Sequence, residues 1–378
     1  MNAPPSLNIG QPIAGVPRSA GDGGMGGPAS AGPQDFDVVM QGTVFLDIVL
    51  TGLTALPSAG TEIPAEGMGS CPGGIANLAI AASRLGLHTS LAASFGDDLY
   101  GDFLVNTLRD EGIDLSMSRR FSNWHSPVTV SLAVQRDRAM ITHSHPSPVP
   151  DARLIDGTPN TAAGVVHLGQ QVPDWIPAAK STGTLLFGDV GWDATEQWST
   201  DTIDQLAQLY AFLPNSREAM AYTRTDDPRA ALMSLADSVP VVVITCGGQG
   251  AIGVDSTTGE EEWVPSLPVN AVDATGAGDV FAAAFVVGSL RQWPLRPRMA
   301  FANLCAALSV QQVGGSLAAP GWGDLSDWLA KVKQQAAAGS RAASVLLHSY
   351  QFLEDELPDG PSLAVRRATA TIARASDA

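Results

Sequence analysis

The chain has 378 residues, of which 45% are hydrophobic and 16% are charged, enough for one large α/β domain or a large domain with a small appendage. Its formal net charge of −17 argues against nucleic acid and anionic membranes as partners, because both bind basic surfaces. No apolar run of the sequence reaches the length that spans a membrane.

Cysteine usage and the N-terminal composition bear on the compartment. The three cysteines, Cys71, Cys246 and Cys305, are scattered and lack the spacing of a metal site, which predicts a reduced, cytoplasmic protein. Residues 1–34 are rich in Gly, Pro, Ala and Ser and contain no apolar core of a signal peptide. We expect them to form a disordered leader.

The first elements are predicted from apolar runs and their breaks. Residues 36–50 predict a buried first strand with an interruption at Gly42. Residues 51–70 are rich in Gly, Pro and Thr and predict turns with short exposed strands. A helix is expected over 77–85, because Ala and Leu recur at helical spacing and Gly86 supplies a stop signal.

The rest of the chain alternates between apolar strands and helices. Strands are expected at 89–95, 128–134, 139–143, 165–168, 185–189 and 239–245, and an Ala/Leu-rich helix at 299–313. This alternation predicts an α/β fold whose mostly parallel sheet is covered on both faces. We expect one domain over 35–335, with a small sheet from strands within about 48–70 and 121–145. Residues 336–378 predict a helix and a tail of unknown role.

The segment Asp273–Asp279 is the most informative motif. Its glycines leave the backbone bare where an extended segment meets an apolar helix, and a helix N-terminus with bare N–H groups favours an anion. Asp279 adds a carboxylate beside that position. Positioned donors with one carboxylate suit phosphoryl transfer to a hydroxyl group. The alternative is an ordinary helix N-terminus with an acidic cap. No lysine follows a glycine loop, which excludes a Walker A motif.

Further pieces follow one another along the chain in a recognisable order. They are Gly42 with Asp47, a loop at Gly73-Gly74 followed by Asn77, Asn215 with Glu218, Thr245 with Gly247 and Gly250, the segment 273–279, and Asn303. Over roughly residues 36–325 this pattern resembles the ribokinase (PfkB) family of carbohydrate kinases. The resemblance implies a ribokinase-like three-layer α/β/α domain with a mostly parallel central sheet and a small β-sheet lid. It also implies an ATP-dependent kinase.

The resemblance assigns roles to the residues nearest the chemistry. Asp279 matches the catalytic base, and Gly276, Ala277 and Gly278 match the anion hole for the γ-phosphate. The acceptor-binding positions are Asp47, Gly73, Gly74 and Asn77. Two of these have structural alternatives, since an aspartate at a strand end is often a turn residue and an asparagine at a helix start often caps it.

Nucleotide and metal positions follow from the same resemblance. Asn215 and Glu218 match a motif that acts through water on Mg²⁺, although the same spacing is the signature of a helix capping box. The nucleotide-side positions are Thr245, Gly247, Gly250, Thr275 and Asn303. The positions where some members hold a monovalent cation such as K⁺ are Asp273, Thr275, Ser309 and Gly314.

The acceptor is predicted from charge. No Lys, Arg or His occurs from Asp35 through Ser83, which favours a neutral sugar over a phosphorylated one. Four arginines of the expected lid argue the other way, because any of them could reach over a phosphate group of the acceptor. They are Arg119, Arg120, Arg136 and Arg138. The alternatives are a nucleoside kinase on the same fold, a phosphosugar kinase, or a non-catalytic sensor of sugar or nucleotide. The Gly pair also lies one residue closer to Asn77 than in the family, with Pro72 at a usual glycine position.

Two surface features complete the predictions. Exposed lid strands have free edges, so a homodimer through the lid is expected. His143 and His145 suggest a metal pair, because alternate residues of a strand share a face. No third ligand is evident from the sequence, so a lid or surface role is the favoured interpretation.

Overall fold

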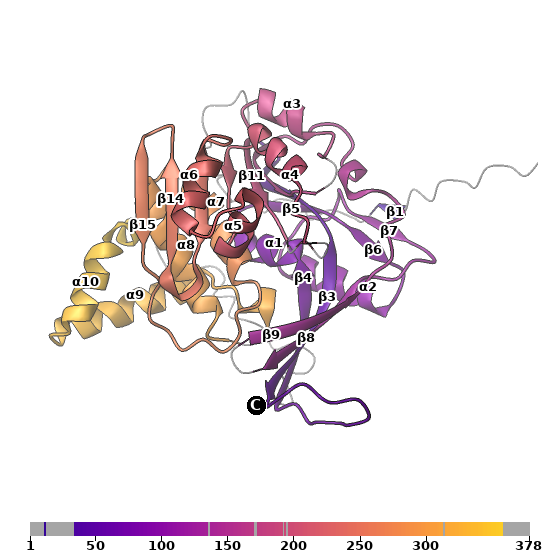
Figure 1. The fold of residues 1–378 in the computed structure, drawn as a ribbon, viewed down its shortest axis with the longest axis horizontal. Coiled ribbons are helices and arrows are strands. Elements are labelled where there is room, and N and C mark those ends of the chain that lie inside the picture. The colour runs from indigo at the N-terminus through magenta and orange to yellow at the C-terminus, as the bar shows by residue number, and fades with distance from the viewer. Residues whose placement is uncertain are drawn as a thin grey trace, which may run out of the picture.

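The computed structural model describes residues 11–12, 34–134, 137–169, 172–191, 193, 196–312 and 314–357, without the side chains of residues 11, 12, 137 and 138 (Figure 1). The predicted leader therefore lies almost wholly outside the described residues, as do Arg136, Val313 and the tail from residue 358. Within the described residues, no helix is both long and apolar enough to cross a membrane.

An eight-stranded sheet forms the centre of the molecule. Its spatial order is β15 (Glu260–Val264), β14 (Ala251–Asp255), β13 (Val241–Thr245), β12 (Ala211–Phe212), β11 (Leu185–Asp189), β10 (Thr161–His167), β2 (Phe36–Gln41) and β5 (Thr89–Ala92). The pairs from β13 through β5 are parallel, and β14 and β15 are antiparallel. The mostly parallel sheet predicted from the alternating pattern is confirmed.

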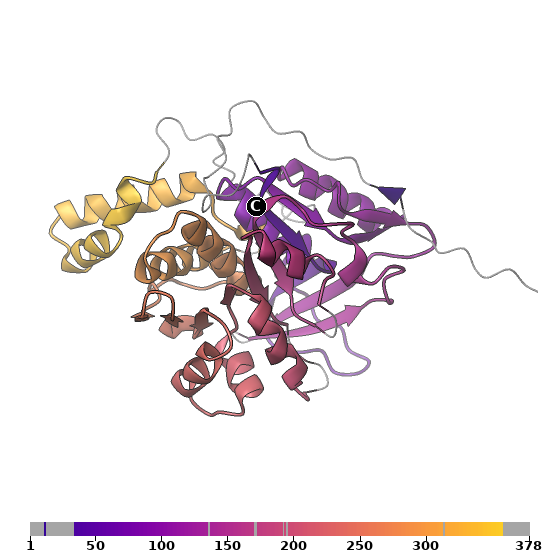
Figure 2. The same cartoon turned by 90° about the horizontal axis from the view of Figure 1, so that it is seen from above.

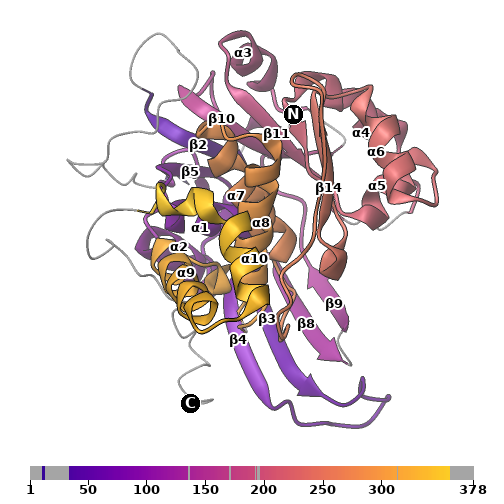
Figure 3. The same cartoon turned by 90° about the vertical axis from the view of Figure 1, so that its left-hand side faces the viewer.

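Helices cover both faces of this sheet. The helices of the described residues are α1 (Ile75–Arg84), α2 (Leu99–Asp110), α3 (Ile176–Ser181), α4 (Thr200–Asp204), α5 (Ser216–Thr223), α6 (Pro228–Ala236), α7 (Ala277–Leu290), α8 (Leu295–Ser309), α9 (Trp322–Ala337) and α10 (Arg341–Ser349). Figure 3 shows α1, α7 and α8 on one side of the sheet and α4, α5 and α6 on the other. Two separate hydrophobic cores are buried in the molecule, and β13 contributes to both. Val241 and Val243 belong to one core and Val242 and Ile244 to the other, because alternate side chains of a strand point to opposite faces of the sheet.

A separate four-stranded sheet extends from this domain. Its order is β4 (Gly67–Gly74), β3 (Val44–Leu53), β8 (Val128–Val134) and β9 (Asp137–His143), as the lower part of Figure 1 shows. The small sheet is thus confirmed, but the single first strand expected over 36–50 is wrong. The chain leaves the central sheet at Gly42, and β3 pairs with β4 and β8 instead. Apolar periodicity identifies a strand but does not reveal which sheet it joins.

The expected location of two arginines is also wrong. Arg119 and Arg120 lie on β7 (Arg119–Phe121), which pairs with β6 (Ser94–Gly96) and β1 (Gln11–Pro12) in a third sheet. Each forms an ion pair, Arg119 with Asp156 and Arg120 with Asp102. They are therefore not part of the small sheet.

The C-terminal helices pack at one side of the molecule. Figure 2 shows α9 and α10, in yellow, on the side opposite β6 and β7. Before them, the chain makes a 3-10 helix at Gly315–Ala318 that lies against α1. Arg84, buried and paired with Glu111, donates to the carbonyl oxygens of Leu317 and Ala319 and fixes this segment.

Candidate active site

The N-terminus of α7 carries the Gly-rich motif. Its N-cap is Gly276, with φ 75°, a left-handed conformation that favours glycine, and no side chain caps the helix. A Cβ on Gly276 would lie 3.2 Å from Cγ of Asn77, so the position also requires a small residue. Gly278 differs, because a Cβ there would meet no atom within 4 Å. Packing within the protein therefore does not require glycine at position 278. An anion bound to the first turn of α7 would require it, because the anion needs the space that a side chain would fill.

Asp279 lies in the same turn and contacts Asn77. The side-chain Nδ2 of Asn77, on the first turn of α1, donates a 2.9 Å hydrogen bond to Oδ2 of Asp279. Asn77 does not cap α1, whose N-cap is Gly74 without a side-chain bond, so the capping interpretation is not realised. Its Oδ1 is buried without a hydrogen-bond partner among the described residues. A buried acceptor of this kind is costly unless a ligand supplies a donor.

Asp47 lies on β3 with its carboxylate beside Gly73. It is 8% exposed and registers with Cys71 on β4 and Thr129 on β8. Gly73 and Gly74 form the end of β4 and not a loop, which corrects the prediction. A Cβ on Gly73 would lie 2.0 Å from Oδ2 of Asp47, so the glycine leaves the volume that the carboxylate occupies.

The segment after α8 closes the site, and its part there was not predicted. Gly315 has φ 50°, and a Cβ on it would lie 3.0 Å from Sγ of Cys71 and 3.5 Å from Cγ2 of Thr275. Ser316 donates to the carbonyl oxygen of Pro72 at 2.6 Å. Thr275 also has a buried hydroxyl with no partner among the described residues. Gly314 was predicted as a cation position, whereas no local pattern indicated that Gly315 and Ser316 would contact Cys71, Thr275 and Pro72.

The proposed monovalent-cation positions form a linked loop. One carboxylate oxygen of Asp273 accepts from the backbone N–H of Thr275 at 2.9 Å, and the other from that of Gly314 at 3.4 Å. The backbone N–H of Asp273 donates to Val310, just after Ser309 ends α8. Ser309 is buried and donates to the carbonyl of Ala306. Asp273 thus joins the α7 motif to the end of α8.

The Asn215 and Glu218 pair forms the capping box that the sequence offered as an alternative. Oδ1 of Asn215 accepts from the N–H of Glu218 at 2.9 Å, and Oε2 of Glu218 accepts from the N–H of Asn215 at 3.0 Å. The box engages only one carboxylate oxygen of Glu218. Asn215 also forms an isolated parallel β-bridge with Thr245, so Asn215 and Glu218 lie beside the turn that follows β13.

Carboxylates gather around Glu218. Burial raises the pKa of the Glu218 carboxyl to about 7, bonds from Asn215 lower it, and the charge of Asp279 raises it. Asp189, at the carboxyl end of β11, has its pKa raised by burial and then by Glu218. Asp189 was not among the predicted site residues, although an aspartate ending a buried parallel strand is a usable signal. Glu218 thus interacts electrostatically with both Asp189 and Asp279, and a cation near these carboxylates would favour their ionised forms.

Stability should therefore depend on pH through Glu218. Its folded pKa exceeds the ordinary value of 4.5, so unfolding releases protons, and the free energy of unfolding falls as pH rises from about 4.5 to about 7. Glu218→Gln should flatten this fall in denaturant unfolding, while Glu62→Gln, at an exposed carboxylate, corrects for net charge. Equal pH slopes in all three chains would contradict the assignment.

Two of the predicted nucleotide-side positions, Gly250 and Asn303, meet at the end of β15. A Cβ on Gly250, with φ 99°, would lie 2.1 Å from the carbonyl oxygen of Val264. Asn303 on α8 donates to the same oxygen at 3.0 Å and to that of Pro265 at 3.4 Å. Thr245 ends β13, and the turn continues through Gly247, where a Cβ would meet open space. Asn303 thus has a structural role that the sequence did not predict.

Comparisons with known proteins agree with this arrangement. The profile of the pfkB family carbohydrate kinase matches residues 40–321. A fructokinase of Klebsiella pneumoniae is 29% identical over 280 residues, which cover 68% of this chain and 91% of that protein. A ribokinase of Bacillus subtilis is 27% identical over 289 residues, covering 74% and 94%.

A solved structure shows the same fold. The crystal structure of a putative Ribokinase II of E. coli in complex with ATP and Mg²⁺ superposes with a TM-score of 0.66 at 18% identity. It covers 78% of this chain and 99% of that one. The ribokinase-like fold expected from the sequence is therefore confirmed.

Proposed function

The chain belongs to the pfkB family of carbohydrate kinases, and from this premise we propose that it transfers the γ-phosphoryl group of ATP to a primary hydroxyl of a neutral sugar. Membership of the family makes it a phosphotransferase with an alcohol group as acceptor. The observation that carries the finer proposal is the contact between Asn77 and Asp279 at the uncapped start of α7.

Asp279 is the base in this proposal. Its carboxylate takes the proton of the acceptor hydroxyl while that oxygen bonds to the γ-phosphorus and the bond from phosphorus to the β-phosphate oxygen breaks, which releases ADP. Asn77 holds the carboxylate through the 2.9 Å bond. The amide oxygen of Asn77 can then accept a hydrogen bond from a hydroxyl group of the sugar. Asp47 accepts hydrogen bonds from hydroxyl groups of the sugar, and its position beside Gly73 supports this role.

The first turn of α7 is the anion hole, formed by Gly276, Ala277 and Gly278. Its N–H groups and the helix dipole favour the charge that gathers on the transferring group. A Cβ at 278 meets open space in the protein alone, so that space is available to phosphate oxygens.

Gly278→Ala tests the anion hole without disturbing the fold. The methyl group should leave the thermal midpoint unchanged or slightly raised, because alanine is the better helix former. It should lower kcat with ATP about tenfold, the effect of a mild steric conflict of ~1.4 kcal/mol. Thermal unfolding and steady-state kinetics measure both. An unchanged kcat would remove Gly278 from the proposed anion hole.

Mg²⁺ fits the carboxylates on the nucleotide side. Glu218 and Asp189 offer carboxylate oxygens whose pKa values are raised first by burial and then by neighbouring carboxylates. A bound cation would favour their ionised forms, and Mg²⁺ prefers oxygen ligands reached partly through water. Glu218 would hold the ion through water, with Asn215 fixing its orientation, and the bound ion would neutralise phosphate charge. The ATP and Mg²⁺ of the E. coli neighbour support this assignment. A K⁺ requirement is proposed for the loop of Asp273, Ser309 and Gly314.

The neutral acceptor is supported by the arginines. Arg119 and Arg120 lie on a different sheet from Asp47 and are paired with the carboxylates of Asp156 and Asp102. The acceptor wall from 35 to 83 contains no Lys, Arg or His. Two relatives are named as a fructokinase and a ribokinase, after neutral sugars, and they favour a neutral sugar as the acceptor here. A nucleoside kinase is the second candidate, because a nucleoside is equally free of phosphate.

An acceptor panel tests the proposed function. ADP release is measured with Mg-ATP and K⁺ against ribose, fructose, 2-keto-3-deoxygluconate, adenosine and fructose 6-phosphate. Turnover on a neutral sugar supports the proposal, and preference for adenosine selects the second candidate. Preference for fructose 6-phosphate, or bound ATP without turnover on any acceptor, would contradict it.

The small sheet is proposed as a lid and as a dimer contact. β9 is an edge strand whose Met140 and Ile141 are 54% and 67% exposed. Closure over the acceptor would exclude water, and pairing of exposed edges in a homodimer would cover the apolar side chains.

A cytoplasmic location is proposed from the three free cysteines.

A further inference from the structure

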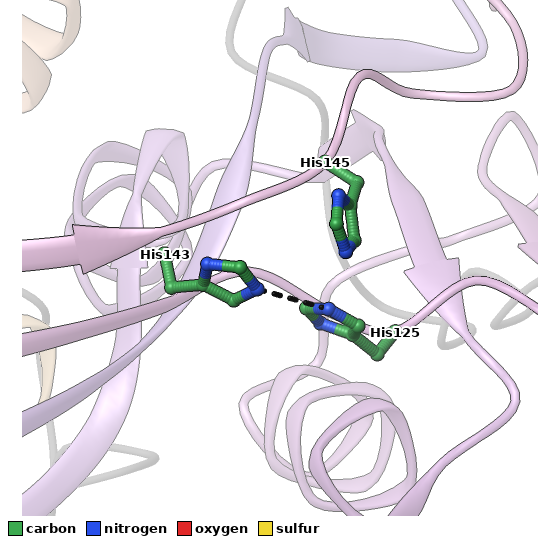
Figure 4. A group of neighbouring side chains, drawn as sticks. All are labelled: His125, His143 and His145. Atoms are coloured by element: carbon green, nitrogen blue, oxygen red, sulfur yellow. Dashed lines mark hydrogen bonds between the residues drawn. The ribbon is translucent and has the colours of Figure 1, made fainter.

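Three of the six histidines of the chain meet at one end of the small sheet. His125 precedes β8, His143 is the last residue of β9, and His145 follows it (Figure 4). Their ligand nitrogens all lie within 4.8 Å of one another. The sequence offered only the pair His143 and His145, and folding supplies the missing third residue from 18 positions earlier.

One pair of these nitrogens already has the spacing of a tetrahedral metal site. Nε2 of His143 lies 3.2 Å from Nε2 of His125. Metal–nitrogen bonds of 2.0–2.1 Å in a tetrahedron place two nitrogens roughly 3.3 Å apart. The His145 nitrogen would have to approach by at most about 1.5 Å, which a side-chain rotation supplies. His143 and His145 are exposed and His125 is half-buried, so an ion has access from solvent.

The backbone on both sides of the cluster is held in place. Trp124 donates through Nε1 to the carbonyl oxygen of Pro146 at 3.0 Å, which joins the two segments next to the histidines. Val128 pairs with His143 across β8 and β9. Ser126 donates to the carboxylate of Asp98 from both its N–H and its hydroxyl. A metal ion would therefore meet ligands that are largely positioned before it binds.

We propose that His125, His143 and His145 form a binding site for a divalent transition metal such as Zn²⁺, with a fourth position open to water. Three imidazoles and no carboxylate in the set select a borderline ion such as Zn²⁺, Ni²⁺ or Co²⁺ over Mg²⁺. The site is separate from the carboxylates around Glu218. The ion would join the end of β9 to the segment that enters β8.

The test titrates the full, tag-free chain with Zn²⁺ by calorimetry in the presence of excess Mg²⁺. We expect one saturable Zn²⁺ per chain and visible absorption of a tetrahedral complex when Co²⁺ replaces Zn²⁺. The double variant His143→Ala/His145→Ala should bind at least about tenfold more weakly. His125→Ala should weaken binding as well, which a site made only of the pair would not predict.

His348→Ala is the matched control, because His348 is an exposed histidine on α10. It should bind Zn²⁺ like the unmodified chain. All variants keep Cys246, the half-buried thiol, so a thiol site would persist in each of them. Circular dichroism confirms that the exposed substitutions leave the fold intact. Equal affinity of the unmodified chain and the double variant, or the absence of saturable binding, would overturn the proposal.

Discussion

Asp279→Asn should reduce turnover by at least about 10²-fold, the usual scale for loss of a general base. Asparagine keeps the shape and an oxygen that accepts from Nδ2 of Asn77, so the 2.9 Å contact survives. What is lost is the ability to take a proton from the acceptor hydroxyl. Nucleotide binding should be retained, because the anion hole uses backbone N–H groups. Steady-state kinetics and equilibrium ATP binding measure the two quantities separately.

The control is Asp201→Asn. Asp201 is likewise an aspartate in the first turn of a helix, α4, and is exposed. Its substitution should leave turnover unchanged, which excludes a general effect of removing an acidic residue from a helix start. If Asp279→Asn retains full turnover, Asp279 is not the base. If it loses both turnover and ATP binding, the defect lies in the site as a whole and the assignment of a base also fails.

Gly73→Ala should lower kcat/KM for the acceptor by about 10²-fold, since misplacing a binding group by about 1 Å costs that much. The three atoms nearest to the added Cβ, at 2.0, 2.2 and 2.5 Å, all belong to the carboxylate end of Asp47. A side chain can rotate away where backbone cannot, so the chain should fold while the carboxylate turns from the acceptor. KM for ATP should stay unchanged.

Two further variants make this result specific. Asp47→Asn should give a similar loss, and the double variant should be no worse than either single one, because both act through the same carboxylate. Gly169→Ala is the matched control, since a Cβ there meets no atom within 4 Å and φ is not positive. A Gly73→Ala enzyme with normal acceptor kinetics would refute the role of Asp47.

The sequence predicted those features of the site whose residues lie close together in one segment of the chain. The stretch 273–279 carries its own glycines, helix start and carboxylate, and it forms the predicted helix N-terminus. The small sheet was also predictable, because exposed strands break the α/β alternation. Both signals depend on residues that are close in the sequence.

Contacts between distant residues were not predictable. Asn77 and Asp279 are separated by 202 positions, and nothing near Asn77 distinguishes a helix cap from a partner of that carboxylate. The end of β4 at Gly73 was taken as a loop, because glycine pairs usually mark turns. His125 joined the pair at 143 and 145 only through the register of β8 with β9. In each case tertiary pairing decided what local propensity left open.

The most direct test of the central claim follows the γ-phosphoryl group itself. ATP labelled at the γ-phosphate is incubated with the enzyme, Mg²⁺ and the best neutral sugar, and the label is located on the product by NMR. The account predicts one labelled phosphate on the primary hydroxyl for each ADP formed, and its near-absence with Asp279→Asn. Label found only as inorganic phosphate, or on a hydroxyl other than the primary one, would contradict the account.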